Sequence, residues 1–122
     1  MSRGLPSQPD FGHNLLTAIE QAGRLATVRK GDLSIGDTVM LRTSNSVYVL
    51  RVAGNNMFAV SGGWFDRKGL SPMLVSIRGC TWGGSIIKVD IVAACGLRVE
   101  FGNRVTTSPV RTIALMRASG AN

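Results

Sequence analysis

Short segments in which apolar and polar residues alternate run from residue 36 to residue 116 of this 122-residue chain. In the first of them, Val39 and Leu41 share one parity, whereas Met40 and Arg42 share the other. A period of two is typical of a strand with one buried face. Glycine and asparagine between the segments favour tight turns, because both residues accept a left-handed backbone. The pattern therefore predicts a mainly β domain built from short, half-buried strands.

Seven such strands with a single helix predict a small six- to seven-stranded barrel or sandwich. Closure is favoured because it removes exposed edges from an apolar, glycine-rich sheet. Residues 62–69 are predicted as a long glycine-rich loop, and the last strand is predicted from Arg104 to about Met116, with Pro109 at a bulge or an edge. The predicted inward-facing residues are, in chain order, Val39, Leu41, Thr43, Tyr48, Leu50, Val52, Met73, Val75, Ile77, Ile87, Val89, Ile91, Leu97, Val99 and Phe101.

The length of the chain fits one domain with a distinct segment at each end. Residues 1–12 contain two prolines and two glycines, so they are expected to form a flexible arm. Residues 13–29 are expected to form a short amphipathic helix that docks on the β domain or on a partner subunit. The β domain is expected over residues 32–117 and a tail over residues 118–122. The apolar residues at helical spacing are Leu15, Leu16, Ile19 and Ala22.

The chain is strongly basic, with 14 Lys and Arg against 7 Asp and Glu and a formal net charge of +7. Eleven of the cations are arginine, whose planar guanidinium suits phosphate and carboxylate groups. The excess points to an anionic partner such as nucleic acid or another polyanion. The alternative is that the charge serves solubility and background ion pairs.

Five cations fall on the predicted solvent parity of five different strands. If several of these strands are neighbours, the cations form a stripe that can bind anions. The alternative is an ordinary solvated face, because Asp90 and Glu100 share the same parity and can pair with the cations. The predicted anion-binding residues are Arg42, Arg51, Arg78, Lys88 and Arg98.

A tryptophan stands beside each of two glycine pairs in the predicted β domain. Trp64 follows Gly62-Gly63, and Trp82 precedes Gly83-Gly84. If both indoles lie at the same end of the barrel, they can form a stacking platform for bases. The competing interpretation is that these tryptophans plug a barrel end or lie buried in a subunit contact.

The sequence contains no arrangement of residues typical of catalysis or metal binding. His13 is the only histidine, Cys80 and Cys95 lack a partner set for zinc, and Asp32 and Asp37 flank a turn, where aspartate commonly bends the chain. We therefore predict no catalytic residues, no metal and no cofactor. The two cysteines are predicted to be buried free thiols in a reducing compartment, and the alternative is a disulfide between them. With no signal peptide or membrane span recognisable, a cytoplasmic location is expected.

Three segments occur in an order that resembles a group of small uncharacterised bacterial proteins. They are residues 42–48 with the pattern T-x-N-S-x-Y, residues 79–88 with G-x-T-x-G-G-S-x-I-K, and residues 106–113 with T-S-P-V-x-x-I. The resemblance covers roughly residues 36–116 and implies a shared all-β fold of bacterial origin. It implies no activity, and no functional residue is transferred from it.

The sequence thus favours a non-enzymatic basic binding module for nucleic acid or another polyanion. The alternative is a self-assembling structural protein with no nucleic-acid role. In that alternative, apolar residues on the outward parity bury against another copy of the chain. These outward residues are Met40, Val47, Val49, Leu74 and Ile86.

Overall fold

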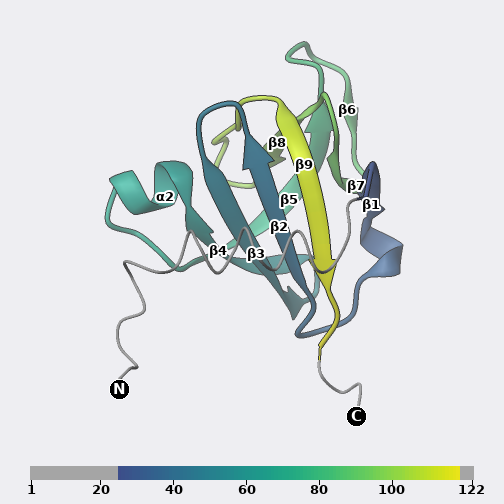
Figure 1. Ribbon diagram of the computed structural model, residues 1–122, viewed down its shortest axis with the longest axis vertical. Coiled ribbons are helices and arrows are strands. Elements are labelled where there is room, and N and C mark those ends of the chain that lie inside the picture. The colour runs from purple at the N-terminus through teal and green to yellow at the C-terminus, as the bar shows by residue number, and fades with distance from the viewer. Residues whose placement is uncertain (1–24, 119–122) are drawn as a thin grey trace.

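The computed structural model describes residues 25–118, which form a strongly curled sheet with a smaller sheet at its side (Figure 1). This confirms the prediction of a mainly β, barrel-like fold. Two short helical segments, η1 (Lys30–Asp32) and α2 (Gly63–Arg67), interrupt the strands. The strands are β1 (Thr27–Arg29), β2 (Thr38–Thr43), β3 (Val47–Gly54), β4 (Met57–Gly62), β5 (Met73–Thr81), β6 (Ile87–Lys88), β7 (Ile91–Ala94), β8 (Arg98–Phe101) and β9 (Val110–Met116).

The main sheet has the strand order β6-β5-β4-β3-β2-β9, and β8 also pairs with β5. Its pairings are antiparallel. β5 belongs to both halves of the fold, since its first residues pair with β4 and its last residues pair with β8 and β6. A register shift between Ile77 and Gly79 lets β5 bend where these halves meet. Gly79 has a φ of 147°, and a Cβ there would lie 2.3 Å from the carbonyl oxygen of Lys88, so this position requires glycine.

The curl is completed by the chain between β8 and β9. The N–H of Thr107 donates to the carbonyl of Val99 at 2.9 Å, and the N–H of Val110 donates to the carbonyl of Leu97 at 2.8 Å. The same segment continues as β9 and pairs with β2. A ring of backbone hydrogen bonds therefore runs from β2 through β3, β4, β5 and β8 to β9. The small sheet of β1 and β7 packs at the side of this ring.

The inward-facing side chains of the curled sheet form one apolar core. The predicted inner parity is confirmed for β2, most of β3, β8 and the first half of β5. Burial of this apolar surface stabilises the fold by about 25 cal/mol for each Å² removed from water. The buried inner residues include Val39, Leu41, Tyr48, Leu50, Val75, Ile77, Val99 and Phe101.

Helix α2 covers one end of the core, where the sequence predicted a loop over residues 62–69. Phe65 is fully buried, and its ring centroid lies 5.1 Å from that of Phe101 and 6.3 Å from that of Tyr48, edge-on in both cases. The Tyr48 hydroxyl accepts a hydrogen bond from the N–H of Trp64 at 3.3 Å. The loop prediction was wrong because tertiary packing of Phe65 outweighs the poor helix propensity of the flanking glycines.

The predicted helix over residues 13–29 extends too far toward the C-terminus. Thr27–Arg29 is strand β1, and Val28 is buried opposite Ala93 of β7. The β-branched residues Thr27 and Val28 favour this pairing over a helical turn. Residues 1–24, which include the predicted arm and most of the predicted helix, lie outside the described residues, as do residues 119–122.

Two strand predictions near the C-terminus need correction. Val89 was predicted to face inward but is 61% exposed, because β6 ends at Lys88 and the chain turns before β7 begins at Ile91. The last strand begins at Val110 rather than Arg104. Pro109 has no N–H to donate to a sheet, so regular pairing starts only after it.

The outer face of β2 was predicted to be exposed, yet Met40 is only 3% exposed. Met40 lies between Ala114 of β9 and Val49 of β3, and these residues form a small second apolar cluster with Val47. Neighbouring strands place these apolar side chains side by side, and Met40 packs against them. Of the other predicted outer residues, Leu74 is 57% exposed and Ile86 is 74% exposed.

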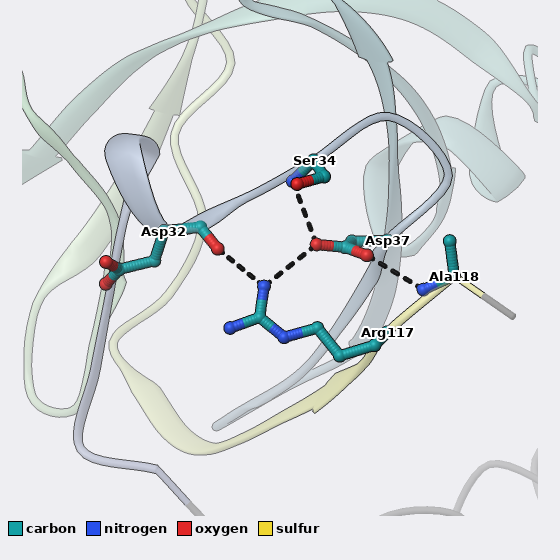
Figure 2. A network of polar contacts seen from close by, with 5 residues as sticks. All are labelled: Asp32, Ser34, Asp37, Arg117 and Ala118. Carbon is teal, nitrogen blue, oxygen red and sulfur yellow. Dashed lines mark hydrogen bonds and ion pairs between the residues drawn. The ribbon is translucent and has the colours of Figure 1, made fainter. Parts of the chain in front are cut away.

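A buried carboxylate joins the start of β2 to the end of β9 (Figure 2). Asp37 is 2% exposed and accepts hydrogen bonds from the N–H of Ser34 at 2.9 Å, the N–H of Ala118 at 2.8 Å and Nη1 of Arg117 at 3.0 Å. Burial alone would raise the pKa of Asp37, but the hydrogen bonds from Ala118 and Ser34 and the guanidinium of Arg117 hold it below its ordinary value. Asp37 therefore bends the chain, as predicted, and also anchors the end of β9.

Candidate nucleic-acid interface

The five predicted anion-binding residues do not form one stripe. Arg78 donates to Glu100 at 2.6 Å, so a neighbouring carboxylate neutralises its charge. Arg51 is exposed on the outer face of β3, opposite Thr38 at the start of β2. Arg42 lies four residues beyond Thr38 along β2. At 3.3 Å per residue, this places Arg42 about 13 Å along the sheet from Arg51. The structure therefore separates Arg51 and Arg78 from Arg42.

Arg42 stands next to the turn that joins β2 to β3, residues 44–46. Thr43 holds this turn in place, because its Oγ1 accepts hydrogen bonds from the N–H of Ser46 at 3.0 Å and of Asn45 at 3.3 Å. Asn45 in turn donates to Oγ of Ser108 at 2.7 Å. The turn thus has a defined backbone and presents hydroxyl and amide groups at its surface.

Two further arginines point at the hydroxyl groups of this turn. Nε of Arg111 lies 3.2 Å from Oγ of Ser44, and Nη1 of Arg67 lies 3.4 Å from Oγ of Ser46. Arg111 is the extra residue at a register shift between β9 and β2, and its neighbour Thr112 lies opposite Arg42. Arg42, Arg67 and Arg111 come from three separate elements, and we call them with residues 44–46 the arginine-lined turn.

Arg98 and the connection between β5 and β6 lie toward the same end of the fold. Nη1 of Arg98 is 3.4 Å from the carbonyl oxygen of Thr107, whose neighbour Ser108 contacts the turn through Asn45. In Figure 1, the β2–β3 turn, the start of β9 and the β5–β6 connection all lie at the upper end of the molecule. The arginine-lined turn and Arg98 therefore contribute positive charge to one end of the barrel.

The two tryptophans do not share a platform. Trp64 lies in α2, is partly buried, and packs edge-on against Phe65 at 5.2 Å between ring centroids. Trp82 follows the other end of β5 and is 66% exposed. Nζ of Lys88 lies 5.4 Å from the centroid of its ring, a cation–π contact. Trp82 is thus the more accessible indole for stacking, with Lys88 over its ring, while Trp64 packs against the core at a barrel end.

Within residues 25–118, three arginines form ion pairs. Arg29 pairs with Asp90 at 2.9 Å, and the other two pairs are those of Arg78 and Arg117 described above. The remaining arginines of this part of the chain form no ion pair with a described carboxylate. They are Arg42, Arg51, Arg67, Arg98, Arg104 and Arg111. No carboxylate among residues 25–118 therefore neutralises the arginines of the arginine-lined turn.

Sequence reasoning missed Arg67 and Arg111. Arg67 lies in the segment predicted as a loop, and Arg111 lies in the predicted last strand, for which no outward residues were assigned. A weak signal was available, since Ser44, Ser46 and Ser108 are small polar residues close to strand ends, where anion-binding hydroxyls are common. Their convergence with the arginines depends on the β2–β9 pairing, which the period of two does not predict.

The two cysteines are free thiols with different surroundings. Cys80 is buried in the core, and burial raises the pKa of its thiol to about 11. Cys95 was predicted to be buried but is exposed, because β7 ends at Ala94 and Cys95 begins the turn to β8. In the described part of the chain, no group of three or more His, Cys, Asp or Glu side chains is placed to hold a metal ion.

No helix among residues 25–118 has the length and apolar character needed to cross a membrane. Comparisons with protein-family models, curated proteins and solved structures find no match to this chain. The resemblance of its three segments to small bacterial proteins therefore stays a prediction.

Proposed function

We propose that this protein is a non-enzymatic module that binds the phosphate backbone of nucleic acid at the arginine-lined turn. The observation that carries the proposal is the direction of two guanidinium groups. Arg67 and Arg111 reach from α2 and β9 toward neutral hydroxyl groups of the same three-residue turn. A neutral acceptor leaves the positive charge uncompensated, in contrast to Arg78, whose partner is a carboxylate.

The spacing of these groups suits phosphate contacts. Ser44 and Ser46 are two residues apart, so their Cα atoms lie at most about 7 Å from one another. Arginine donates two parallel hydrogen bonds to phosphate oxygens, and serine and asparagine side chains add neutral donors. Arg98 and the exposed ring of Trp82 extend the surface at the same end of the barrel. Stacking on Trp82 would favour single strands, whose bases are accessible.

Contacts of this kind fix a nucleic acid by its backbone and read little of its sequence. We therefore expect binding in the micromolar range at low salt, with similar affinity for unrelated sequences. The affinity should fall as salt rises, because each phosphate contact releases condensed counterions.

The test is the affinity for fluorescent oligo(dT), measured by anisotropy over a range of salt concentrations. The double variant Arg67→Gln with Arg111→Gln should bind more weakly. Its slope of log K against log[salt] should be less steep by about 1.4, because each of the two lost phosphate contacts contributes about 0.7 on a single strand. The matched control is Arg29→Gln with Arg51→Gln, which removes the same charge away from the turn and should bind like the unmodified protein.

Two results would refute the proposal. One is the absence of binding to any nucleic acid by the unmodified protein at about 50 mM salt. The other is an equal loss of affinity in both double variants, which would mean that net charge alone attracts the ligand. A discrete oligomer free of nucleic acid, together with the first result, would favour the self-assembly alternative.

A further inference from the structure

A cavity of about 380 Å³ lies at the end of β3 opposite the arginine-lined turn. Its walls come from the segment after η1 and from the β3–β4 hairpin. Cavities of about 300–1,000 Å³ are typical of small-molecule sites. The apolar part of the wall includes Leu33, Val52 and Phe58, with Ile35 at the surface. The cavity is thus large enough for a ligand and is mainly apolar.

Backbone hydrogen bonds fix both sides of this cavity. The N–H of Gly36 donates to the carbonyl of Val52, and the N–H of Val52 donates to the carbonyl of Asp37, each at 2.9 Å. On the other side, Asn55 and Asn56 have φ angles of 54° and 59°, so the hairpin has a defined left-handed turn. The walls are therefore formed before any ligand binds, which lowers the entropic cost of binding.

Lys30 is the charged residue among those that line the cavity. Burial lowers the pKa of its ammonium group, and the carboxylate of Asp90 partly opposes that effect. Asp90 itself is paired with Arg29 at 2.9 Å, and Lys30 forms no ion pair with any carboxylate among residues 25–118. An ammonium group that has lost part of its hydration and has no ion-pair partner in the described part of the chain favours a bound anion.

Amide groups lie on the hairpin side of the same cavity. Asn56 donates through Nδ2 to the carbonyl of Ile77 at 3.4 Å, so its amide is oriented by the fold. The amide of Asn55 is exposed at the wall. Together with Lys30 these groups supply a few polar contacts around an apolar chamber, the arrangement typical of sites for small organic molecules.

We propose that this cavity binds a small organic anion with an apolar body, a monocarboxylate. Its carboxylate pairs with the Lys30 ammonium group, and its hydrocarbon part lies against Leu33, Val52 and Phe58. The site lies about 23 Å from the arginine-lined turn, seven steps of 3.3 Å along β3. It is therefore independent of the proposed nucleic-acid site.

The experiment is a titration of the full chain with octanoate, followed by heteronuclear NMR, with octanamide as a neutral ligand of the same shape. Octanoate should shift the amide signals of residues 30–36 and 52–58 and should bind at least about tenfold more tightly than octanamide, since one hydrogen bond to a charged group is worth that factor. Shifts elsewhere, equal affinity for the two ligands, or no saturable binding would overturn the proposal.

Variants of the protein test the role of the ammonium group. Lys30→Met keeps the apolar stem and should weaken octanoate binding about tenfold while leaving octanamide binding unchanged. Lys68→Met is the matched control, because Lys68 is exposed at the end of α2 and does not line the cavity. Unchanged octanoate affinity in the Lys30 variant would overturn the proposal. The melting temperature of each variant shows whether it folds. If the Lys30 variant does not fold, the comparison of octanoate with octanamide on the unmodified protein still tests the proposal.

Discussion

Asp37→Ala should destabilise the protein strongly, although this carboxylate lies far from the arginine-lined turn. The variant removes the acceptor for the N–H groups of Ser34 and Ala118, each of which loses a hydrogen bond to a charged group worth about 1.5 kcal/mol or more. Arg117 is 57% exposed, so its ion pair adds little. We expect a loss of about 3 kcal/mol, which lowers the melting temperature by about 12 °C or more in a domain of this size.

The dependence of this loss on pH follows from the lowered pKa of Asp37. A carboxylate with a lower pKa in the folded state stabilises the fold above its unfolded pKa, and that contribution disappears as the pH falls through the folded pKa. The difference in stability between the unmodified protein and Asp37→Ala should therefore be constant near neutral pH and should shrink below about pH 4.

The assay is urea unfolding followed by tryptophan fluorescence at several pH values, with Asp32→Ala as the control. Asp32 is exposed, and its backbone carbonyl rather than its carboxylate contacts Arg117. The control should therefore change the stability by no more than about 0.5 kcal/mol. Equal effects of the two variants, or a difference that grows as the pH falls below 4, would refute the reasoning about Asp37.

Two further predictions concern the core. Phe65→Ala should cost about 3–5 kcal/mol in the free energy of unfolding, since it leaves a cavity beside Tyr48 and Phe101; a loss below about 1 kcal/mol would show that α2 does not close the core. Iodoacetamide at neutral pH should label one thiol of the native protein, the exposed Cys95, and two after unfolding, because Cys80 is buried and its thiol has a pKa of about 11. Native labelling of both thiols would contradict the burial of Cys80.

The inner faces of the strands were predictable because alternation depends only on which side of a strand is buried. Val39, Leu41, Val99 and Phe101 therefore face the core as expected. Strand limits were less predictable, because they depend on partners distant in sequence. The segment before Val110, for example, bonds to β8 instead of continuing β9.

Tertiary packing overrode local preference at two places. Residues 63–67 contain a glycine and two aromatic side chains, which favour a helix only weakly, yet Phe65 gains a buried position by forming α2. The sequence predicts residues 27–29 as the end of a helix, but they pair with β7 and bury Val28. In both cases the deciding contact is made by a residue far away along the chain.

The candidate site was only partly predictable. Charge and parity predicted Arg42 and Arg98 as outward cations. Arg42 is exposed and Arg98 is half-buried, and both lie toward the end of the barrel that carries the site. Arg67 and Arg111 could not be assigned, because their approach to Ser44 and Ser46 results from the placement of α2 and β9. Ion pairing could not be predicted from the sequence either. Arg78 has the same outward parity as the other predicted cations, but Glu100 neutralises its charge.

The most direct test of the central proposal is to locate the bound nucleic acid by NMR. Titration with oligo(dT) at low salt should shift the backbone amides of residues 43–47, 67–68 and 108–112 and the side-chain Nε–Hε signals of Arg67 and Arg111. The signal of Arg51, four residues along β3 from its start at the turn, should stay unchanged. Shifts confined to residues outside the arginine-lined turn, or none at saturating ligand, would contradict the account.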